Sequence, residues 1–243
     1  MNGRKLDFGA VQREPDVRML DEMRDLLLDQ EWAADAQNQA LYYMYRNLYR
    51  EEHRDVIQDN DLRFDITVIP PKRLGREYVK TKGHYHPEAE KGVPYPEIYE
   101  VMSGKAHYLL QKRDSGGSVA DVVVVSATAG DKVIIPPGYG HITINPGRKA
   151  LKMANWVSTR FDSDYGPIEA NNGGAYYETV AGEFIPNQRY GDLPELRRAD
   201  PEQVPELGIR EEILMYTLIE SPDSLAFLNR PHKYQWIFDE LYQ

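Results

Sequence analysis

The chain has 243 residues, a formal net charge of −10 and no cysteine. This length suits one large domain or two small ones, and no window approaches the roughly 18 to 20 consecutive apolar residues that a membrane-spanning helix requires. The acidic balance disfavours nucleic acid and anionic membranes as partners. The lack of cysteine excludes disulfides and thiolate metal sites, and the N-terminus lacks the apolar core of a signal peptide, so we expect a cytoplasmic protein.

Residues 1–60 are predicted to form an arm and a helix that pack on the rest of the protein. Residues 1–14 are polar and are expected to be loosely held. From Pro15, apolar residues recur at the three- and four-residue spacing of an amphipathic helix, which is expected to pack on the body rather than bind a partner. These apolar residues are Val17, Leu20, Met23, Leu26 and Leu27. Residues 40–49 contain four tyrosines, and both a helix and a strand remain open there, as a packing surface or as a wall of hydroxyls.

From residue 62 the hydrophobic period changes from helix to strand. The stretch 62–69 is rich in β-branched residues and ends at two prolines, which stop a strand. Further short strands, separated by turn residues, are predicted at 77–86, 97–102, 106–113, 119–126, 132–135, 141–145 and 150–158. A series of strands without intervening helices indicates a closed barrel or jelly roll, because closure removes exposed sheet edges. We therefore predict a mainly β protein centred on a barrel at residues 61–168.

Residues 169–243 are predicted to be a C-terminal extension with short helices. Two strands, at 175–180 and 183–185, are expected to pair around a short turn. Pro222 follows a serine in the pattern of a helix N-cap with proline at the first helical position, and Pro231 repeats this arrangement. The sequence contains no clear linker, so arm, barrel and extension are expected to form one structural domain.

Three histidines and one glutamate occupy positions where strands could bring them to one point. Side chains two apart in a strand share a face and lie about 6.6 Å apart along it, so His84 and His86 can aim both imidazoles at one ion. Glu97 begins another strand and His141 lies on a third. This set of nitrogen and oxygen donors suits Fe²⁺, Mn²⁺, Zn²⁺ or Ni²⁺ better than Ca²⁺, which prefers oxygen alone. The spacing favours a metal site over incidental histidines.

The two blocks that contain these residues resemble the two signature motifs of the cupin superfamily. In the first block, the histidine pair is followed by Glu97 and then by Gly104. The second block fits the cupin pattern without a gap, at Gly130, Pro136, Gly138, His141 and Asn145. The resemblance implies a cupin jelly-roll barrel, with the N-terminal and C-terminal helical segments as additions to it.

The first block departs from the cupin pattern in one respect. Ten residues separate His86 from Glu97, and this spacing is longer than in the usual cupin motif. Three other carboxylates are therefore rivals of Glu97, namely Glu88, Glu90 and Glu100. Strand parity favours Glu97 over Glu100. The glycine that follows Glu97 at the expected distance favours it over the other two.

Within the cupins, the flanking sequence resembles the cupin-type glucose-6-phosphate isomerases, the metal-dependent class known best from archaea. The resemblance runs from about residue 16 to 168 and is carried mainly by 75–86, 97–99, 136–145 and 164–166. It implies an isomerase of glycolysis and gluconeogenesis that acts on a phosphosugar and forms a homodimer. It also implies one divalent metal ion per subunit, with iron preferred and manganese, zinc or nickel as alternatives.

At matching positions, the resemblance implies roles for individual residues. It makes His84, His86, Glu97 and His141 the metal ligands, with Glu97 also the candidate catalytic base. It implies a second group that binds the phosphate of the substrate, consisting of Thr67, Thr81, Gly83, Tyr99 and Tyr42.

The chemistry of an aldose–ketose isomerase is compatible with this set. Hydrogen moves between C1 and C2, either through an enediol with the help of a base or by a hydride shift with the help of a metal. A metal-ligating Glu97 is a weakened base, because the cation lowers its proton affinity, so both routes remain open. Simple alternation places Thr81 and Gly83 on the face opposite His84 and His86, unless Gly83 marks a bulge or bend.

Two other functions are compatible with the same ligands. One is an iron-dependent cupin dioxygenase and the other is a sugar-binding cupin without catalysis; the hydroxyls of Thr67, Thr81 and Tyr99 favour the isomerase. Of the other histidines, His53 and His232 are expected to be incidental. His107 could line the cavity.

Overall fold

The computed structural model describes residues 5–9 and 11–243, and this part of the chain is mostly β-structure. The strands are β1 Leu6–Phe8, β2 Val11–Arg13, β3 Asp16–Met19, β4 Ala40–Tyr45, β5 Leu62–Ile69, β6 Arg73–Leu74, β7 Glu77–Tyr78, β8 Glu97–Ser103, β9 Lys105–Arg113, β10 Val119–Thr128, β11 Lys132–Ile135, β12 Tyr139–Ile144, β13 Leu151–Ser158, β14 Tyr176–Glu178, β15 Phe184–Pro186 and β16 Arg197–Ala199. The α-helices are α1 Gln30–Asp35, α2 Arg54–Asp59, α3 Gly166–Ala170 and α4 Gln235–Phe238. Short 3₁₀ helices lie at Leu20–Glu22, Arg24–Leu26, Glu51–His53, Glu90–Gly92, Gln188–Tyr190, Pro205–Leu207, Met215–Glu220, Pro222–Leu228 and Pro231–Lys233.

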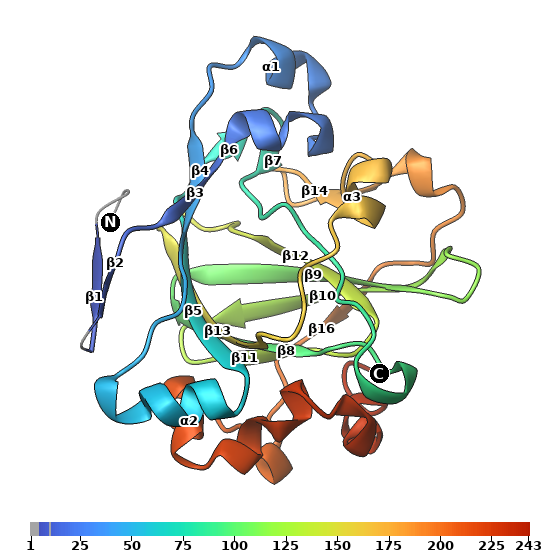
Figure 1. Ribbon diagram of the computed structural model, residues 1–243. Helices are drawn as coiled ribbons and strands as arrows, with labels where there is room; N and C mark the ends of the chain where they lie inside the picture. Colours follow the sequence, from blue (N-terminus) through green and yellow to red (C-terminus); the bar gives the residue numbers. More distant parts are fainter. Residues whose placement is uncertain (1–4, 10) are drawn as a thin grey trace.

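Two sheets form the body of the protein (Figure 1). The six-stranded sheet has the order β11-β8-β13-β5-β4-β3, and the four-stranded sheet has the order β12-β9-β10-β16. Neighbouring strands in both sheets are antiparallel except β10 and β16. The chain passes repeatedly from one sheet to the other, since β8, β11 and β13 lie in the six-stranded sheet and β9, β10 and β12 in the four-stranded sheet. The prediction of a mainly β jelly-roll barrel is therefore confirmed.

The strands predicted between residues 62 and 158 correspond closely to observed ones, apart from the stretch 77–86. There only β7 is a regular strand, and single bridges follow at Lys80, His84 and Tyr85. Gly83 has φ +77°, a left-handed conformation that interrupts the extended chain. Strand alternation therefore does not apply across this segment, which removes the conflict between Thr81 and the histidine pair.

The predicted amphipathic helix from Pro15 to Leu27 is wrong. Residues 16–19 form β3, which pairs with β4 and makes residues 40–45 a strand, and two 3₁₀ turns follow. The apolar residues after β3 are buried all the same, because tight turns also bring residues three apart to one side. Pairing of β3 at the edge of the sheet outweighs the weak helical signal of the local sequence.

The N-terminal residues that the structure describes are not a loose arm. β1 and β2 pair with each other, and Leu6 and Val11 are buried against the core. The part of the prediction that concerns residues 1–4 and 10 lies outside the described residues. None of the helices in the described ranges is long and apolar enough to cross a membrane.

The last part of the C-terminal extension, residues 205–243, covers the outer face of the six-stranded sheet (Figure 1, red). Trp156 of β13 donates through Nε1 to the Met215 carbonyl oxygen at 3.0 Å and stacks on Tyr216. Tyr216 also contacts Phe64 of β5 edge to face. The expected strand pair is present as β14 and β15, and 3₁₀ helices begin at both predicted prolines, although no side chain caps them.

Candidate metal centre

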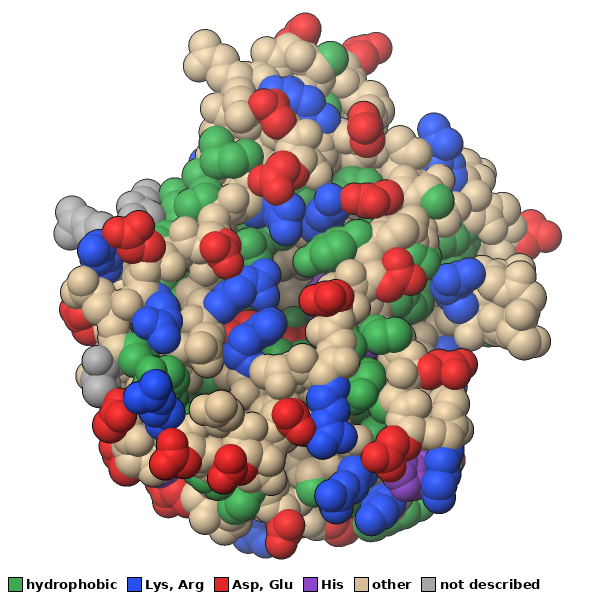
Figure 2. All heavy atoms as spheres, viewed as in Figure 1, with side chains coloured by type: hydrophobic (Ala, Val, Ile, Leu, Met, Phe, Trp, Pro, Cys, Tyr) green, Lys and Arg blue, Asp and Glu red, His purple; other side chains and the backbone are tan. Residues whose placement is uncertain are grey.

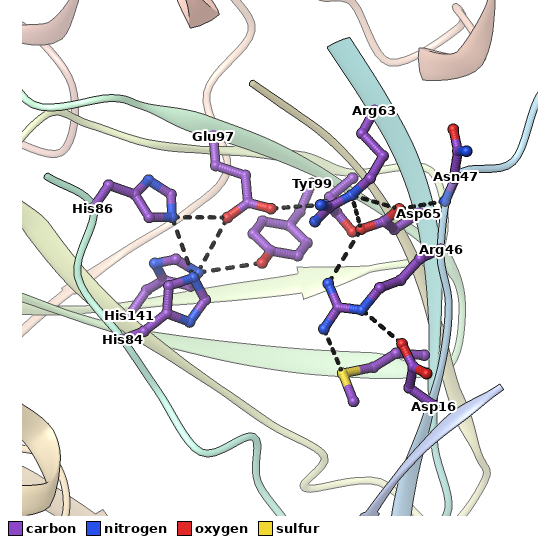
Figure 3. Close-up of polar contacts among 12 residues, drawn as sticks. Asp16, Arg46, Asn47, Arg63, Asp65, His84, His86, Glu97, Tyr99 and His141 are labelled. Atoms are coloured by element: carbon purple, nitrogen blue, oxygen red, sulfur yellow. Dashed lines mark hydrogen bonds and ion pairs between the residues drawn. The ribbon is translucent and has the colours of Figure 1, made fainter. Parts of the chain in front are cut away.

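Four side chains converge inside the barrel, as Figure 3 shows. His84, His86, Glu97 and His141 each offer a ligand atom, and these atoms all lie within 4.8 Å of one another. Glu97 Oε2 lies 3.4 Å from His86 Nε2 and 3.3 Å from His141 Nε2. His84 Nε2 lies 3.2 Å from His86 Nε2. The structure thus brings together all four residues that the sequence singles out as metal ligands.

The irregular segment before β8 is held against β12 so that both histidine groups meet. The backbone of His84 and His141 exchanges two hydrogen bonds, at 3.3 and 3.0 Å. Two glycines permit the close approach, because a Cβ at Gly83 would lie 2.4 Å from the Ile142 side chain and one at Gly140 would lie 2.5 Å from the Tyr85 ring. The glycines therefore act here through the space they leave free.

The electrostatics of the cluster keep His84, His141 and Glu97 in the protonation states that metal ligation needs. Burial lowers the pKa of His84 well below its ordinary value, and His141 and His86 lower it further. Burial also lowers the pKa of His141. For Glu97, burial alone would raise the pKa, but the adjacent His141 and His86 more than offset this, so the pKa lies well below its ordinary value. The result is neutral imidazoles at His84 and His141 beside an ionised carboxylate at Glu97.

Two observations indicate that the cluster fits a cation. Glu97 Oε2 is buried and has no hydrogen-bond partner among the described residues, and such an atom is costly unless something else binds it. His86 bonds through Nδ1 to the Tyr95 carbonyl oxygen at 2.9 Å. That bond places the proton on Nδ1 and directs the Nε2 lone pair into the cluster, as in most protein metal sites. The buried cluster is therefore suited to hold a metal ion.

The long insertion between His86 and Glu97 supports the cluster instead of displacing it. It supplies Tyr95, whose carbonyl orients His86 and whose ring stacks on Phe161 with centroids 4.7 Å apart. Phe161 in turn lies against the His86 ring at 4.5 Å. The insertion and the segment after β13 thus fix His86 from two sides.

The rival carboxylates lie elsewhere. Glu100 points to the outer face of the sheet, 3.4 Å from Lys132 Nζ and bonded to the backbone of Met215. Glu88 and Glu90 lie on the exposed insertion, where Glu90 is 3.7 Å from His232. Only Glu97 reaches the histidines, as strand parity predicts.

A cavity of about 390 Å³ opens beside the cluster, and Figure 2 shows the hollowed face with Lys and Arg side chains along its rim. The residues expected to bind substrate all line it, namely Thr67, Thr81, Gly83, Tyr99 and Tyr42. The Tyr99 hydroxyl lies 3.2 Å from His141 Nε2. The Tyr42 hydroxyl accepts a hydrogen bond from the Lys82 backbone at 3.1 Å.

Other residues of the cavity were not singled out from the sequence. They are Arg46, Arg63, Asp65, Asn155, Phe161 and Ser158 among others. Asn155 donates from Nδ2 to Glu97 Oε1 at 2.7 Å, which fixes the carboxylate with Oε2 toward the imidazoles. In the strand 62–69, polar residues alternate with apolar ones, which indicates one polar face. No motif assigned a function to these polar residues.

The other histidines do not line the cavity. His107 forms a buried pair with Glu178, at 2.8 Å from Nδ1, so the suggestion that it lines the cavity is wrong. His53 contacts the Tyr216 hydroxyl at 3.2 Å. These contacts join the barrel to the segments around it.

Sequence comparison relates this chain to proteins of known function. A sequence model of the family glucose-6-phosphate isomerase (GPI) matches residues 17–195. The glucose-6-phosphate isomerase of Thermococcus litoralis is 30% identical over 172 residues, which cover 68% of this chain and 83% of that protein. The enzyme of the same name from Pyrococcus furiosus is 28% identical over the same shares. A solved oxalate oxidase in complex with the substrate analogue glycolate aligns with a TM-score of 0.35 and 20% identity, over 46% of this chain and 49% of its own. On the family match and the identity to these relatives, this chain belongs to the glucose-6-phosphate isomerase family and is an isomerase.

Proposed function

We propose that the protein interconverts glucose 6-phosphate and fructose 6-phosphate, with one divalent metal ion per subunit held by His84, His86, Glu97 and His141. The observation that carries the proposal is the buried cluster of three imidazoles and one carboxylate at the cavity, in a chain of this family. The unpartnered Glu97 Oε2 supports a bound cation.

Mixed nitrogen and oxygen donors are compatible with iron, manganese, zinc or nickel, and the family resemblance favours iron. A divalent ion at this position would act as a Lewis acid on neighbouring C1 and C2 oxygens of the sugar. Four protein ligands leave room for substrate oxygens on a six-coordinate ion.

Glu97 is the candidate base for moving hydrogen between C1 and C2. Its Oε1 accepts a hydrogen bond from Asn155 at 2.7 Å. Its Oε2 faces the imidazoles, where it is proposed to bind the metal ion. Neither oxygen is therefore free to act as a base alone. This arrangement weakens Glu97 as a base and gives weight to the direct hydride shift. The two routes differ in one measurable respect: an enediol exchanges the moving hydrogen with solvent, so deuterium from D₂O enters the product, whereas a hydride shift retains the original hydrogen.

The phosphate of the substrate is proposed to bind among the hydroxyls of Thr67, Thr81, Tyr99 and Tyr42 and the backbone of Gly83. All five line the cavity. Hydroxyl and amide donors can hold a dianion without reacting with it. The cytoplasmic location and the homodimer stay predictions, and light scattering of the purified protein would measure the second.

The test is a coupled assay of isomerase activity together with metal analysis. We expect activity in metal-reconstituted wild type, loss of bound metal in His141→Ala, and loss of turnover with metal retained in Glu97→Gln if Glu97 is the base. Full metal loss in both variants would leave Glu97 as a ligand only. A wild type that contains metal but turns over neither sugar phosphate would overturn the proposal.

A further inference from the structure

Two arginines on the wall of the cavity belong to no motif of the sequence. Arg63 lies on β5, and Arg46 follows the last residue of β4. Both line the cavity, and their side chains are about one third exposed, at 31% and 38%. In Figure 3 the Arg46 guanidinium points from the sheet toward Tyr99 and the histidine cluster. The part of the cavity wall formed by β5 and the end of β4, in the same sheet as Glu97, therefore carries two cations.

One buried carboxylate holds both arginines in place. Asp65, whose side chain is 5% exposed, accepts from Arg63 Nε at 3.0 and 2.8 Å and from the Asn47 backbone at 2.8 Å. Its Oδ2 is 3.6 Å from Arg46 Nη1. Because one carboxylate serves two guanidinium groups, the group of three carries a net positive charge. Asp16, which binds Arg46 Nε at 3.0 Å, is largely exposed and solvent screens it.

The Nη atoms of Arg63 remain available, and those of Arg46 have only weak or long contacts. No acceptor among the described residues bonds the Nη atoms of Arg63, which is anchored through Nε alone. Arg46 Nη2 is 3.3 Å from the Met44 sulfur, which is a weak acceptor. A guanidinium fixed at one edge with its other donors free is suited to bind two oxygens of a carboxylate or phosphate.

We propose that Arg46 and Arg63, braced by Asp65, form an anion-binding pair that engages an acidic group of the sugar ligand from the β4–β5 side of the cavity. The shared ligand chemistry is an oxyanion on a sugar, either a phosphate ester or the carboxylate of a sugar acid. The pair then determines specificity for charged over neutral sugars. The proposed function supplies the identity of the sugar phosphate, but the anion site does not depend on turnover.

Lys82 is the other cation of the cavity, and its situation differs. Its ammonium group is 2.6 Å from Glu169 Oε1 and lies over the Tyr165 ring at 5.2 Å. An anion would have to displace Glu169 to bind it. The arginine pair needs no such exchange.

The experiment is isothermal titration of the metal-reconstituted protein with four probes: inorganic phosphate, fructose 6-phosphate, gluconate and fructose. We expect Arg63→Met to weaken binding of fructose 6-phosphate and inorganic phosphate about tenfold or more, because a hydrogen bond to a charged group is lost. Arg63→Lys should lie between wild type and Arg63→Met, since it keeps the charge and loses the fork. Binding of fructose should not change.

The choice of probes distinguishes a phosphate group from a carboxylate group as the anion that the pair binds. If gluconate binds and depends on Arg63 while the phosphates do not, the pair recognises a carboxylate. If both phosphates depend on it, the pair recognises phosphate. Unchanged affinity for all three anions in Arg63→Met and in Arg46→Met would overturn the proposal.

Two further variants control for the loss of an arginine–aspartate pair and for misfolding. Arg160 bonds Asp61 at 2.9 and 2.7 Å outside this cavity, so Arg160→Met removes an arginine–aspartate pair without touching the site, and its affinities should match wild type. Arg63→Met leaves Asp65 partly unpaired, and if it misfolds, the double variant Arg63→Met with Asp65→Asn removes both charges.

In steady-state kinetics of the Arg63 variants, the loss of substrate affinity should appear as a higher KM with kcat nearly unchanged. Arginine-dependent phosphate binding without any isomerase activity would defeat the proposed function and leave this inference standing.

Discussion

The two faces of the six-stranded sheet are formed by alternate residues of the same strands, and their side chains differ in character. On β5, Arg63, Asp65 and Thr67 face the cavity. Phe64 and Ile66, between them, belong to the hydrophobic core on the other side. The inner face is largely polar and contains the candidate ligand-binding groups, whereas the outer face is mainly apolar and is covered by residues 205–243.

The difference between the two faces explains how the protein can contain a buried polar site and remain folded. Buried polar and charged groups cost free energy unless they are paired, and the inner face keeps Glu97 Oε2 without a partner among the described residues. The outer face supplies stability through aromatic packing of Trp156, Phe64 and Tyr216. Changes on the two faces should therefore separate stability from function.

The largest effect is expected on the outer face. Trp156 is fully buried and bonded to Met215, so Trp156→Ala should lower the free energy of unfolding by about 3–5 kcal/mol. Urea denaturation measures it. As a control, Trp236 is 56% exposed, and Trp236→Ala should change stability by less than about 0.5 kcal/mol. Similar losses in both variants would contradict the assignment of the outer face.

An intermediate effect is expected on the inner face. Asn155→Ala removes the hydrogen bond that orients Glu97, and loss of such a supporting contact typically lowers metal affinity about 10–100-fold. Competition with a metal-binding dye measures this affinity. Stability of the metal-free protein should change much less than in Trp156→Ala. Metal affinity equal to that of wild type would mean that Asn155 does not position the carboxylate.

The smallest effect concerns pH and the metal-free protein. Because burial lowers the pKa of His84 and His141, the unfolded chain binds protons on these residues at a higher pH than the folded chain does. Their contribution to stability is therefore present above the unfolded value of about 6.5 and is lost as the pH falls below it.

Urea denaturation of chelated protein at pH 8 and at pH 5.5 measures this loss. His141→Gln removes one of the two groups, so the difference in stability between the two pH values should be smaller in this variant than in wild type. The same pH dependence in both proteins would rule out His141 as a source of it.

The strand pattern and the metal cluster could be read from the sequence because both depend on short-range rules. β-branched residues in 62–69 and turn residues around the later strands predicted β5, β8 and β13 almost to the residue. The fold brought His84, His86, Glu97 and His141 together because each lies at or beside a strand that the jelly roll joins. By contrast, the helix predicted after Pro15 failed, since pairing with β4 is a long-range contact that local spacing does not report.

The sequence by itself determined the acidic character, the β-rich centre, the donor types of the candidate metal site and the choice of Glu97 by parity. Only the tertiary structure decided which polar side chains share the cavity with that cluster. Arg46 follows β4, Arg63 lies on β5 and Asn155 lies on β13, and the order of strands in the sheet brings these segments together. Residue spacing reports which face of a strand a side chain occupies, but the neighbour across the barrel is set by packing of the two sheets.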